Sequence, residues 1–389
     1  MADPVVILGS GLAGYNLARE FRKLDKTTPL VVVSRDAAGF YSKPMLSNAL
    51  AGGKTAASLV MKPAEKMAAE LDATVLARTE ALHIDTAART VALAAGQTLR
   101  YRDLVLALGA DPIQIPLEGD AAAQVLQVND LDDYARFAER LGAGETGAKT
   151  VALLGAGLIG CEFANDLLAR GLRPVVLDLA DRPLSRLLPA EASAFLRQRL
   201  EAAGVEFRFG VGASRVDARP GGGLQVGLSD GSALEVDLVL SAIGLRPRTA
   251  LAREAGLTVE RGIAVDRTLA TSAQHVFAIG DCAEVAGLNL PYVMPLMHQA
   301  RALGATLGSG MATPVAYPAM PVVVKTPACP TVVCPPPQGA AGTWATDLSE
   351  GGCEARFTAA DGTLLGFAVL GSATARKQAL AARVPALLG

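Results

Sequence analysis

Two glycine-rich turns of one type constrain this chain more than any other feature of its sequence. Gly9-Ser10-Gly11-Leu12-Ala13-Gly14 follows the apolar run 5–8, and Gly155-Ala156-Gly157-Leu158-Ile159-Gly160 follows the apolar run 151–154. Each turn precedes an Ala/Leu-rich segment, so each reads as a strand, a G-x-G-x-x-G turn and a helix, which is the fingerprint of a dinucleotide-binding unit. One copy is a weak signal, whereas two copies in the same context predict a chain that holds two dinucleotides.

The glycines and the acid that follows them have separate physical roles. The first glycine allows a tight turn, the second lets the backbone approach a pyrophosphate, and the third lets the helix pack against the strand. Asp178, 18 residues after Gly160, is placed to bind a ribose hydroxyl and favours NAD over NADP, although the nearby Arg182 leaves NADP open. Asp36 follows Gly14 by 22 residues and is slightly displaced from that spacing.

Apolar runs between helical segments predict the fold class. Such runs are typical of buried parallel strands. We expect strands at 30–33, 104–108, 174–178 and 237–243, and helices at 12–24 and 158–170. The order after the second turn repeats the order after the first, and both repeats end in an Asp-Leu-Val-Leu strand that stops at a glycine, Gly109 or Gly244. The sequence therefore predicts an α/β protein with two Rossmann-like domains.

The length of 389 residues suits two or three domains. The apolar run 276–281 follows the second unit, and we expect it to return the chain to the first domain, so that the second domain is an insertion. Residues 111–116 read as a linker. From Tyr317 onward prolines cluster, and strands at 322–324 and 364–367 indicate a small α+β C-terminal domain. The expected boundaries are 1–112 and 243–316 for the first domain, 113–242 for the inserted domain and 317–389 for the last.

Composition and charge narrow the class of protein only in part. The net charge of −2 argues neither for nor against nucleic-acid or membrane binding, whereas the 4% of aromatic residues disfavours base-stacking platforms. No apolar run approaches the ~20 residues of a membrane span, and Met1-Ala2-Asp3-Pro4 lacks the basic start of a signal peptide. The five cysteines are scattered and imply no disulfide framework. We expect a cytoplasmic protein without metal, nucleic acid or stable membrane insertion, and the sequence does not determine its oligomeric state.

The combined pattern resembles the two-dinucleotide-binding flavoprotein reductases of the glutathione-reductase superfamily. The resemblance covers residues 4–310 and includes a later fingerprint, the strand Phe277-Ala278-Ile279 followed by Gly280-Asp281. It implies that the N-terminal unit binds FAD, that the inserted unit binds NAD(P)H, and that Asp281 contacts the flavin ribitol.

Three shorter segments resemble one branch of that superfamily. Disulfide reductases carry a cysteine pair after the second FAD strand, but residues 39–47 contain no cysteine. This stretch, with segments 157–167 and 324–330, is most similar to the rubredoxin reductases of the ferredoxin-reductase-like group. The resemblance implies a cytoplasmic enzyme that passes a hydride from NADH to FAD and then single electrons to rubredoxin or a similar small iron carrier.

The resemblance also implies which residues bind each cofactor. The expected FAD residues are Gly9, Gly11, Leu12, Ala13, Gly14, Asp36, Lys43, Ala81, Ala107, Gly109, Asp281, Val293 and Lys325. The expected NAD residues are Gly155, Gly157, Leu158, Ile159, Gly160, Glu162, Asp178 and Gly244.

Lys43 and Glu162 are the expected catalytic residues. Glu162 is expected against the nicotinamide amide and in a charge contact with Lys43, and Lys325 is expected at the isoalloxazine edge. Cys329 and Cys334 have a C-x-x-x-x-C spacing but lie in the wrong domain for a redox pair. Three alternatives stay open: a ferredoxin-type reductase of an oxygenase, an NADH oxidase or peroxidase with a redox cysteine, and a flavoprotein that senses NADH by binding alone.

Overall fold

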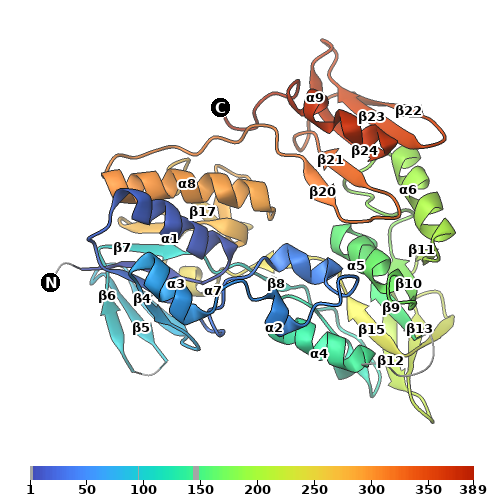
Figure 1. Ribbon diagram of the computed structural model, residues 1–389, viewed down its shortest axis with the longest axis horizontal. Helices are drawn as coiled ribbons and strands as arrows, with labels where there is room; N and C mark the ends of the chain where they lie inside the picture. The colour runs from blue at the N-terminus through green and yellow to red at the C-terminus, as the bar shows by residue number, and fades with distance from the viewer. Residues whose placement is uncertain (1–2, 95, 143–148) are drawn as a thin grey trace.

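The computed structural model describes residues 3–94, 96–142 and 149–389. Met1 and Ala2 lie outside these ranges. They are the first two residues of Met1-Ala2-Asp3-Pro4, the start that lacks the basic residues of a signal peptide. The chain forms two parallel sheets with helices packed on them and a third, antiparallel sheet near the C-terminus (Figure 1). The predicted α/β fold with an inserted second unit and a small C-terminal part is confirmed. The exact domain boundaries stay a prediction.

The first sheet is built from both ends of the first domain. Its strands are all parallel and run in the order β18-β7-β1-β2-β3. They are β1 (Val5–Leu8), β2 (Leu30–Val33), β3 (Thr74–Leu76), β7 (Asp103–Leu106) and β18 (Val276–Ala278). Since β18 pairs with β7, the chain returns to this sheet after the second unit, as the sequence predicts.

Helices and two smaller sheets surround the first sheet. Helices α1 and α8 pack side by side (Figure 1). The helices are α1 (Leu12–Leu24), α2 (Ala56–Leu59), α3 (Ala64–Leu71), α7 (Ala250–Glu254) and α8 (Val293–Ser309), with 3-10 turns η1 (Lys43–Asn48) and η3 (Gly280–Cys282). The smaller sheets are β4 (Ala81–Asp85), β5 (Thr90–Leu93) and β6 (Thr98–Arg100), and the pair β17 (Ile263–Val265) and β19 (Ala283–Val285).

The second parallel sheet repeats the pattern in the order β11-β10-β9-β15. Its strands are β9 (Thr150–Leu154), β10 (Arg173–Asp178), β11 (Glu206–Phe209) and β15 (Leu238–Ser241). Its helices are α4 (Leu131–Leu141), α5 (Leu158–Leu168) and α6 (Ala190–Ala202), with the 3-10 turn η2 (Ala122–Gln124). An antiparallel sheet of β12 (Ala213–Ala218), β13 (Leu224–Leu228) and β14 (Ala233–Val236) lies beside it.

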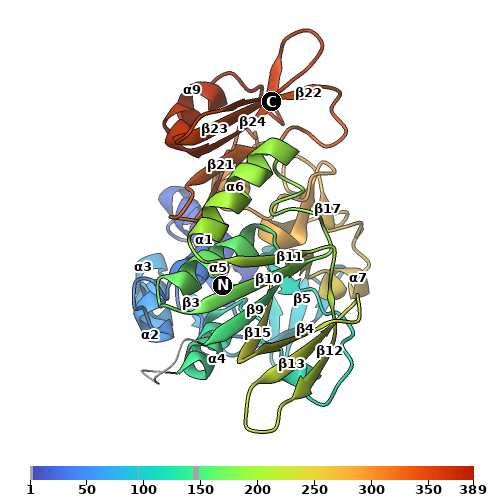
Figure 2. The same cartoon turned by 90° about the vertical axis from the view of Figure 1, so that its right-hand side faces the viewer.

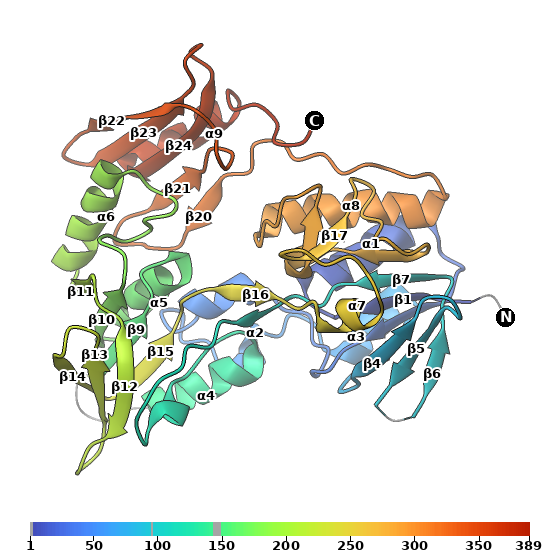
Figure 3. The same cartoon turned by 180° about the vertical axis from the view of Figure 1, so that it is seen from behind.

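Residues 111–116 are only partly a linker. Ala110–Pro112 forms β8, which pairs antiparallel with β16 (Leu245–Pro247). The two crossings between the parallel sheets therefore form one two-stranded connection, which Figure 3 shows between the two units. Sequence periodicity misses this pair because each strand has only three residues.

The C-terminal part is an antiparallel sheet in the order β20-β21-β24-β23-β22. Its elements are β20 (Val322–Val324), β21 (Thr331–Cys334), β22 (Thr343–Leu348), β23 (Gly352–Thr358), β24 (Leu364–Gly371), η4 (Ser372–Arg376) and α9 (Lys377–Ala381). Helix α6 of the second unit lies against this sheet (Figure 2).

One hydrophobic core joins all three parts of the chain. Its buried members include side chains from the first domain, from the helices of the second unit and from the C-terminal sheet. Representative members are Leu46, Leu50 and Leu59, then Phe137, Phe163 and Leu196, and then Val324, Val333 and Leu370. Burial of apolar surface is the main favourable term in folding, so this shared core fixes the three parts against one another.

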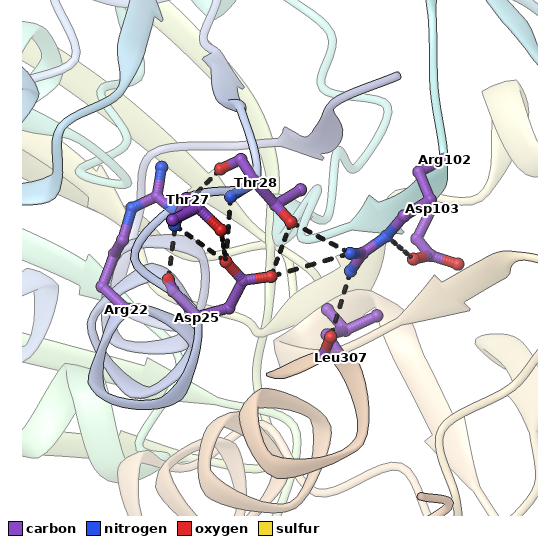
Figure 4. A network of polar contacts seen from close by, with 7 residues as sticks. All are labelled: Arg22, Asp25, Thr27, Thr28, Arg102, Asp103 and Leu307. Carbon is purple, nitrogen blue, oxygen red and sulfur yellow. Dashed lines mark hydrogen bonds and ion pairs between the residues drawn. The ribbon is translucent and has the colours of Figure 1, made fainter. Parts of the chain in front are cut away.

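A polar network closes the amino end of the first sheet (Figure 4). Arg102 donates to Asp103 at the start of β7, with 2.7 Å between Nε and Oδ2, and to the Leu307 carbonyl of α8 at 3.0 Å. Arg22 of α1 donates to the Thr28 carbonyl at 2.8 Å. These contacts stabilise the amino ends of the strands. Ligands of such sheets bind at the opposite side, outside the carboxyl ends.

Candidate functional site

A cavity of about 970 Å³ lies at the carboxyl ends of the strands. Its wall includes Leu8 and Gly9 after β1, Ala107 after β7, and Gly280 after β18. Side chains of the second unit and of the C-terminal part complete the wall. A crevice outside the carboxyl ends of parallel strands is where this class of sheet binds its ligands.

The first glycine turn is built for close packing at two positions and for open space at one. A Cβ on Gly9 would lie 2.1 Å from the Ala107 carbonyl oxygen, and one on Gly14 would lie 1.9 Å from the Gly9 carbonyl oxygen. A Cβ on Gly11 would meet nothing within 4 Å, yet Gly11 lines the cavity. The protein itself therefore requires Gly9 and Gly14, whereas Gly11 keeps space free for a ligand beside the start of α1. Such a cradle fits a pyrophosphate.

The second turn has the same construction. A Cβ on Gly160 would lie 1.9 Å from the Gly155 carbonyl oxygen, and one on Gly155 would lie 2.7 Å from the Ala242 carbonyl oxygen. A Cβ on Gly157, the residue before α5, would again meet nothing within 4 Å. Two independent turns thus leave the same position open, and the backbone N–H groups at each helix start have no side-chain cap.

Asp178 ends β10 beside the second turn. Its Oδ2 accepts a hydrogen bond from the Ala156 N–H at 2.5 Å, and its Oδ1 accepts from the Ala180 N–H at 2.8 Å. These bonds hold the carboxylate at the glycine turn. Asp178 and the three glycines of this turn do not line the cavity, whereas Leu158, Ile159, Glu162 and Gly244 do. The second unit therefore reaches the cavity through the start of α5 and the segment after β15.

Asp36 is held in the corresponding place of the first unit. Its Oδ1 accepts from the Ser34 hydroxyl at 2.7 Å and from the Ala38 N–H at 2.8 Å, and the Ser10 hydroxyl lies 3.3 Å away. The displaced spacing in the sequence thus still brings this carboxylate to the cavity wall. Ser10 and Ser34 were not predicted as site residues, although both directly adjoin predicted strands.

Lys43 and Asp281 form a charged wall of the cavity with Arg248. Burial lowers the pKa of Lys43, and the negative charge of Asp281 opposes that shift. Burial likewise raises the pKa of Asp281, and the charges of Lys43 and Arg248 oppose it. Arg248 donates to the Leu108 carbonyl at 2.8 Å and to Asp111 Oδ1 at 2.6 Å. Arg248 was missed at the sequence level, although the Leu-Arg-Pro-Arg run after Gly244 was a visible signal.

Glu162 pairs with Lys325 in place of Lys43, which corrects the predicted charge contact. Glu162 is fully buried, and its carboxylate accepts from the Ser47 hydroxyl at 2.5 Å, from the Lys325 N–H at 2.8 Å and from the Lys325 ammonium group. No ion pair between Lys43 and Glu162 occurs among the described residues. Lys325 follows β20, and its approach to Glu162 depends on domain packing that sequence order does not encode.

Comparisons with known proteins agree with this geometry. Residues 3–304 match the family model described as pyridine nucleotide-disulphide oxidoreductase, and residues 314–384 match the rubredoxin binding C-terminal domain. The first match covers most of the chain. This chain belongs to the pyridine nucleotide-disulphide oxidoreductases. Within that family it is 49% identical to a rubredoxin-NAD(+) reductase of Alcanivorax borkumensis, over 99% of each chain.

Two further proteins are similar to this chain over most of their length. The chain is 40% identical to a nitric oxide reductase FlRd-NAD(+) reductase of Aeromonas salmonicida, over 94% of this chain and 92% of that one. The solved structure of a ferredoxin reductase from Rhodopseudomonas palustris is 30% identical, with a TM-score of 0.85 over 95% of this chain and 91% of that one.

The remaining predicted FAD residues also take positions around the first glycine turn. Leu12, Ala13, Ala81, Gly109 and Val293 line the cavity, as do Lys43, Ala107 and Lys325. Gly14 lies behind the wall, where it packs against Gly9. The structure thus brings residues from positions 9 to 325 to one cavity, and their contact with FAD stays a prediction.

This family is named for disulphide chemistry, but the cysteines of this chain are not arranged for it. All five are free and buried. Burial raises the pKa of the Cys282, Cys334 and Cys353 thiols to about 11 and raises those of Cys161 and Cys329 as well. A protonated, enclosed thiol is a poor nucleophile. Cys329 and Cys334 are not bonded to each other.

The described residues contain neither a membrane-spanning helix nor a metal-binding cluster. No helix within residues 3–94, 96–142 and 149–389 is long and apolar enough to cross a bilayer. The same ranges contain no cluster of three or more His, Cys, Asp and Glu side chains that could hold a metal ion.

Proposed function

We propose that this chain is an FAD-dependent NADH:rubredoxin oxidoreductase. One observation carries the proposal: a single cavity is bounded by the first glycine turn, by the start of α5 in the second unit, and by β20 of the part that matches the rubredoxin-binding model. An electron donor site, a flavin site and an acceptor-binding part therefore meet at one place.

The residues around the first turn fit FAD. Gly11 leaves room for the pyrophosphate, and Asp36 offers a carboxylate for a ribose hydroxyl. Lys43, Asp281 and Lys325 supply charged groups to the part of the cavity that the flavin ring and ribitol would occupy. The main chain at Gly109 has a φ of +73°, a conformation that glycine adopts without strain.

The residues around the second turn fit NADH. Gly157 leaves room for its pyrophosphate, and Asp178 stands where an adenosine ribose 2′-hydroxyl would donate a hydrogen bond. A 2′-phosphate there would meet a carboxylate of like charge, so NADPH is expected to bind less well. Leu158, Ile159, Glu162 and Gly244 extend from this turn into the cavity.

The residues of this cavity would position the two rings relative to each other. When bound, FAD accepts a hydride from NADH and passes electrons on one at a time, which an iron acceptor needs. Glu162 offers a carboxylate that is held by Ser47 and Lys325 at the nicotinamide side. Lys43 lines the cavity near Asp281, and in its protonated form it would favour negative charge on the reduced ring. Precise placement of this kind contributes much of the rate in such reactions.

We further propose that rubredoxin docks where β20 and the start of α8 meet the cavity. Met294 is 45% exposed and Val323 is 55% exposed, and both line the cavity mouth. Exposed apolar side chains grouped at one site are typical of protein-binding surfaces. The free cysteines and the use of NADH suit a reducing cytoplasm, which we propose as the location.

An acceptor assay tests the proposed function. The FAD-loaded protein is mixed with NADH, and rubredoxin and ferredoxin are offered in turn without oxygen while the absorbance of each is followed. Oxygen is then offered alone, and its consumption is measured with an electrode. Fast reduction of rubredoxin, with slow or no reduction of the others, supports the proposal. Fast reduction of ferredoxin indicates a ferredoxin-type reductase, fast oxygen consumption indicates an oxidase, and NADH binding without turnover indicates a sensor. Each of these three results overturns the proposal.

A second acceptor has specific support. The relatives from Aeromonas are named as reductases of a nitric oxide reductase flavorubredoxin, and their identity to this chain reaches 40%. The same assay with a flavorubredoxin in place of free rubredoxin tests that acceptor. A higher kcat/KM for the flavorubredoxin would assign the chain to that system.

A further inference from the structure

Helix α5 carries a buried polar face close to the cavity, which the start of the helix lines. Its residues from Gly160 to Leu167 are all buried. Glu162 is 0% exposed, Asn165 8% and Asp166 2%. Because these positions are three and four residues apart, their side chains project from the same face of the helix.

Asn165 and Asp166 both bind main chain from other parts of the molecule. Asp166 accepts hydrogen bonds from the N–H groups of Leu50 at 3.0 Å and Ala51 at 2.8 Å, one with each carboxylate oxygen. Asn165 Oδ1 accepts from the Ala328 N–H at 3.0 Å. One helix of the second unit is thus hydrogen-bonded to a segment of the first domain and to a segment of the C-terminal part.

Both bound segments carry charged side chains of the cavity. Leu50 and Ala51 come directly after η1, which contains Lys43 and Ser47. Ala328 comes three residues after Lys325. Glu162, one turn before Asp166 on the same helix, bonds Ser47 and Lys325 themselves. The polar face of α5 therefore bonds the segment that follows Lys43 at Ser47, Leu50 and Ala51, and the segment of Lys325 at Lys325 and Ala328.

The cost of this arrangement argues that it has a purpose besides folding. A buried carboxylate is expensive, and replacing buried polar groups with packed apolar ones is often neutral or stabilising. Burial raises the pKa of Asp166 to about 6, although the Ala51 and Leu50 N–H groups and the charge of Arg170 oppose the shift. An apolar side chain could fill this space, but it could not hold two N–H groups in fixed directions.

We propose that Asn165 and Asp166 are positioning residues for the flavin and nicotinamide rings. They hold the segments of Lys43 and Lys325 at fixed places relative to Glu162, the carboxylate that is proposed to face the nicotinamide. This inference rests on the proposed function. Neither residue lines the cavity, so each acts through other residues and neither touches a cofactor.

The test compares three variants of the FAD-loaded protein. Asp166→Ala removes both acceptors, Asp166→Asn keeps one, and Glu284→Ala is the matched control. Like Asp166, Glu284 is a buried carboxylate that does not line the cavity and accepts a hydrogen bond from a main-chain N–H, that of Gly262 at 2.8 Å. Unlike Asp166, it lies in the first domain and bonds neither the segment of Lys43 nor that of Lys325. Reduction of the flavin by excess NADH is followed in an anaerobic stopped-flow experiment without any acceptor, and hydrogen exchange of the amides is measured in parallel.

The expected result is a rate defect without a binding defect. Asp166→Ala should slow flavin reduction about tenfold or more while the NADH concentration for half-maximal rate changes little, because small misplacements of reacting groups cost this much. Asp166→Asn should recover part of the rate, and Glu284→Ala should keep the wild-type rate even if it melts earlier. Exchange should rise across residues 43–51 in Asp166→Ala, and not in Glu284→Ala.

Two results would overturn the inference. One is flavin reduction at the wild-type rate in Asp166→Ala. The other is an equal slowing in Glu284→Ala, since this would trace the defect to general loss of stability. If Asp166→Ala does not fold, Asp166→Asn takes its place. Flavin reduction at the wild-type rate in Asp166→Asn, or an equal slowing in Glu284→Ala, would then overturn the inference. Because the assay contains no acceptor, failure of the wild-type protein to reduce rubredoxin would count against the proposed function only.

Discussion

Lys325 and Glu162 are joined in the structure, and this pairing changes what each side chain contributes at the cavity. Lys325 Nζ is partly exposed and bonded to a carboxylate that is fully buried. The pair is neutral as a unit. Removal of the ammonium group therefore leaves an uncompensated negative charge beside the flavin site, which is costly in a buried environment.

Because of this pairing, we expect Lys325→Met to lower the two-electron potential of the bound flavin. The freed charge of Glu162 opposes the negative charge that reduction brings, and about 1.4 kcal/mol of such repulsion corresponds to roughly 30 mV. Equilibrium titration with a dye of known potential measures the shift. Lys325→Arg keeps the charge and serves as the control. An unchanged potential in Lys325→Met would remove Lys325 from the electrostatics of the flavin.

Two glycines of the second turn are expected to affect different properties, one the affinity for NADH and the other the stability of the fold. Gly157→Ala should change the unfolding free energy by less than about 0.5 kcal/mol, because the added methyl meets no atom within 4 Å. It should weaken NADH binding about tenfold, or roughly 1.4 kcal/mol, because it occupies the space for the pyrophosphate. Gly160→Ala should instead destabilise the fold by about 1–3 kcal/mol, because its methyl would overlap the Gly155 carbonyl.

Thermal unfolding and calorimetric titration with NADH separate these two effects. The pair is informative because both substitutions lie in one turn and add the same methyl group. Normal NADH affinity in Gly157→Ala would show that the open space beside that residue is not the phosphate site.

At the scale of the element, α5 connects a cofactor turn to both other parts of the chain. Its Leu158 end adjoins the cavity, its Glu162–Asp166 face binds two distant segments, and its apolar residues belong to the shared core. The helix has little freedom to move without breaking these bonds. We therefore expect its polar face to leave a signature in the pH dependence of stability.

The pKa of Asp166 predicts the sign of that dependence. This pKa is about 6 in the folded protein, against the ordinary value of 3.8 for an aspartate, so the fold favours the protonated form. This contribution to stability is complete below pH 3.8 and is lost as the pH rises through 6. Asp166→Asn does not titrate, so the wild-type protein should lose up to about 3 kcal/mol relative to it between pH 4 and pH 8. Urea unfolding at several pH values tests this, and parallel curves for the two proteins would contradict it.

At the scale of the whole molecule, the shared core determines how the protein unfolds. Buried side chains from the first domain, the second unit and the C-terminal sheet form one cluster. A part that is removed would leave apolar surface exposed on the others. Domains with small polar interfaces tend to unfold separately, but this interface is large and hydrophobic.

We accordingly expect the second unit and the C-terminal part to unfold in one cooperative transition. Scanning calorimetry of the FAD-loaded protein should show them as a single peak, and limited proteolysis should not release residues 317–389 as a stable fragment. Phe163→Ala, which removes a buried ring from the shared core, should lower the stability of both parts together by about 3–5 kcal/mol. Two resolved peaks would mean that the parts are independent.

The sequence predicts the regular elements well where they are long and apolar. The helix expected at 12–24 and the strand expected at 30–33 have those bounds in the structure. The helix expected at 158–170 ends at Leu168, two residues early. The antiparallel sheets β4–β6 and β12–β14 went unpredicted, because their short strands are not the continuous apolar runs that mark buried parallel strands. The alternation of buried and exposed positions in β13 and β14 was the signal that could have found them.

What the sequence determined by itself is local: two glycine turns between a strand and a helix, an acid after the next strand, and the absence of cysteine from residues 39–47. These follow from backbone geometry and residue chemistry within a few turns of chain. The tertiary structure decided which distant charges meet. It paired Glu162 with Lys325 in place of Lys43, set Arg248 beside Asp281 and Lys43, and bound α5 to two other segments. Such contacts depend on how three sheets that lie far apart in the sequence pack together, and no local spacing records that.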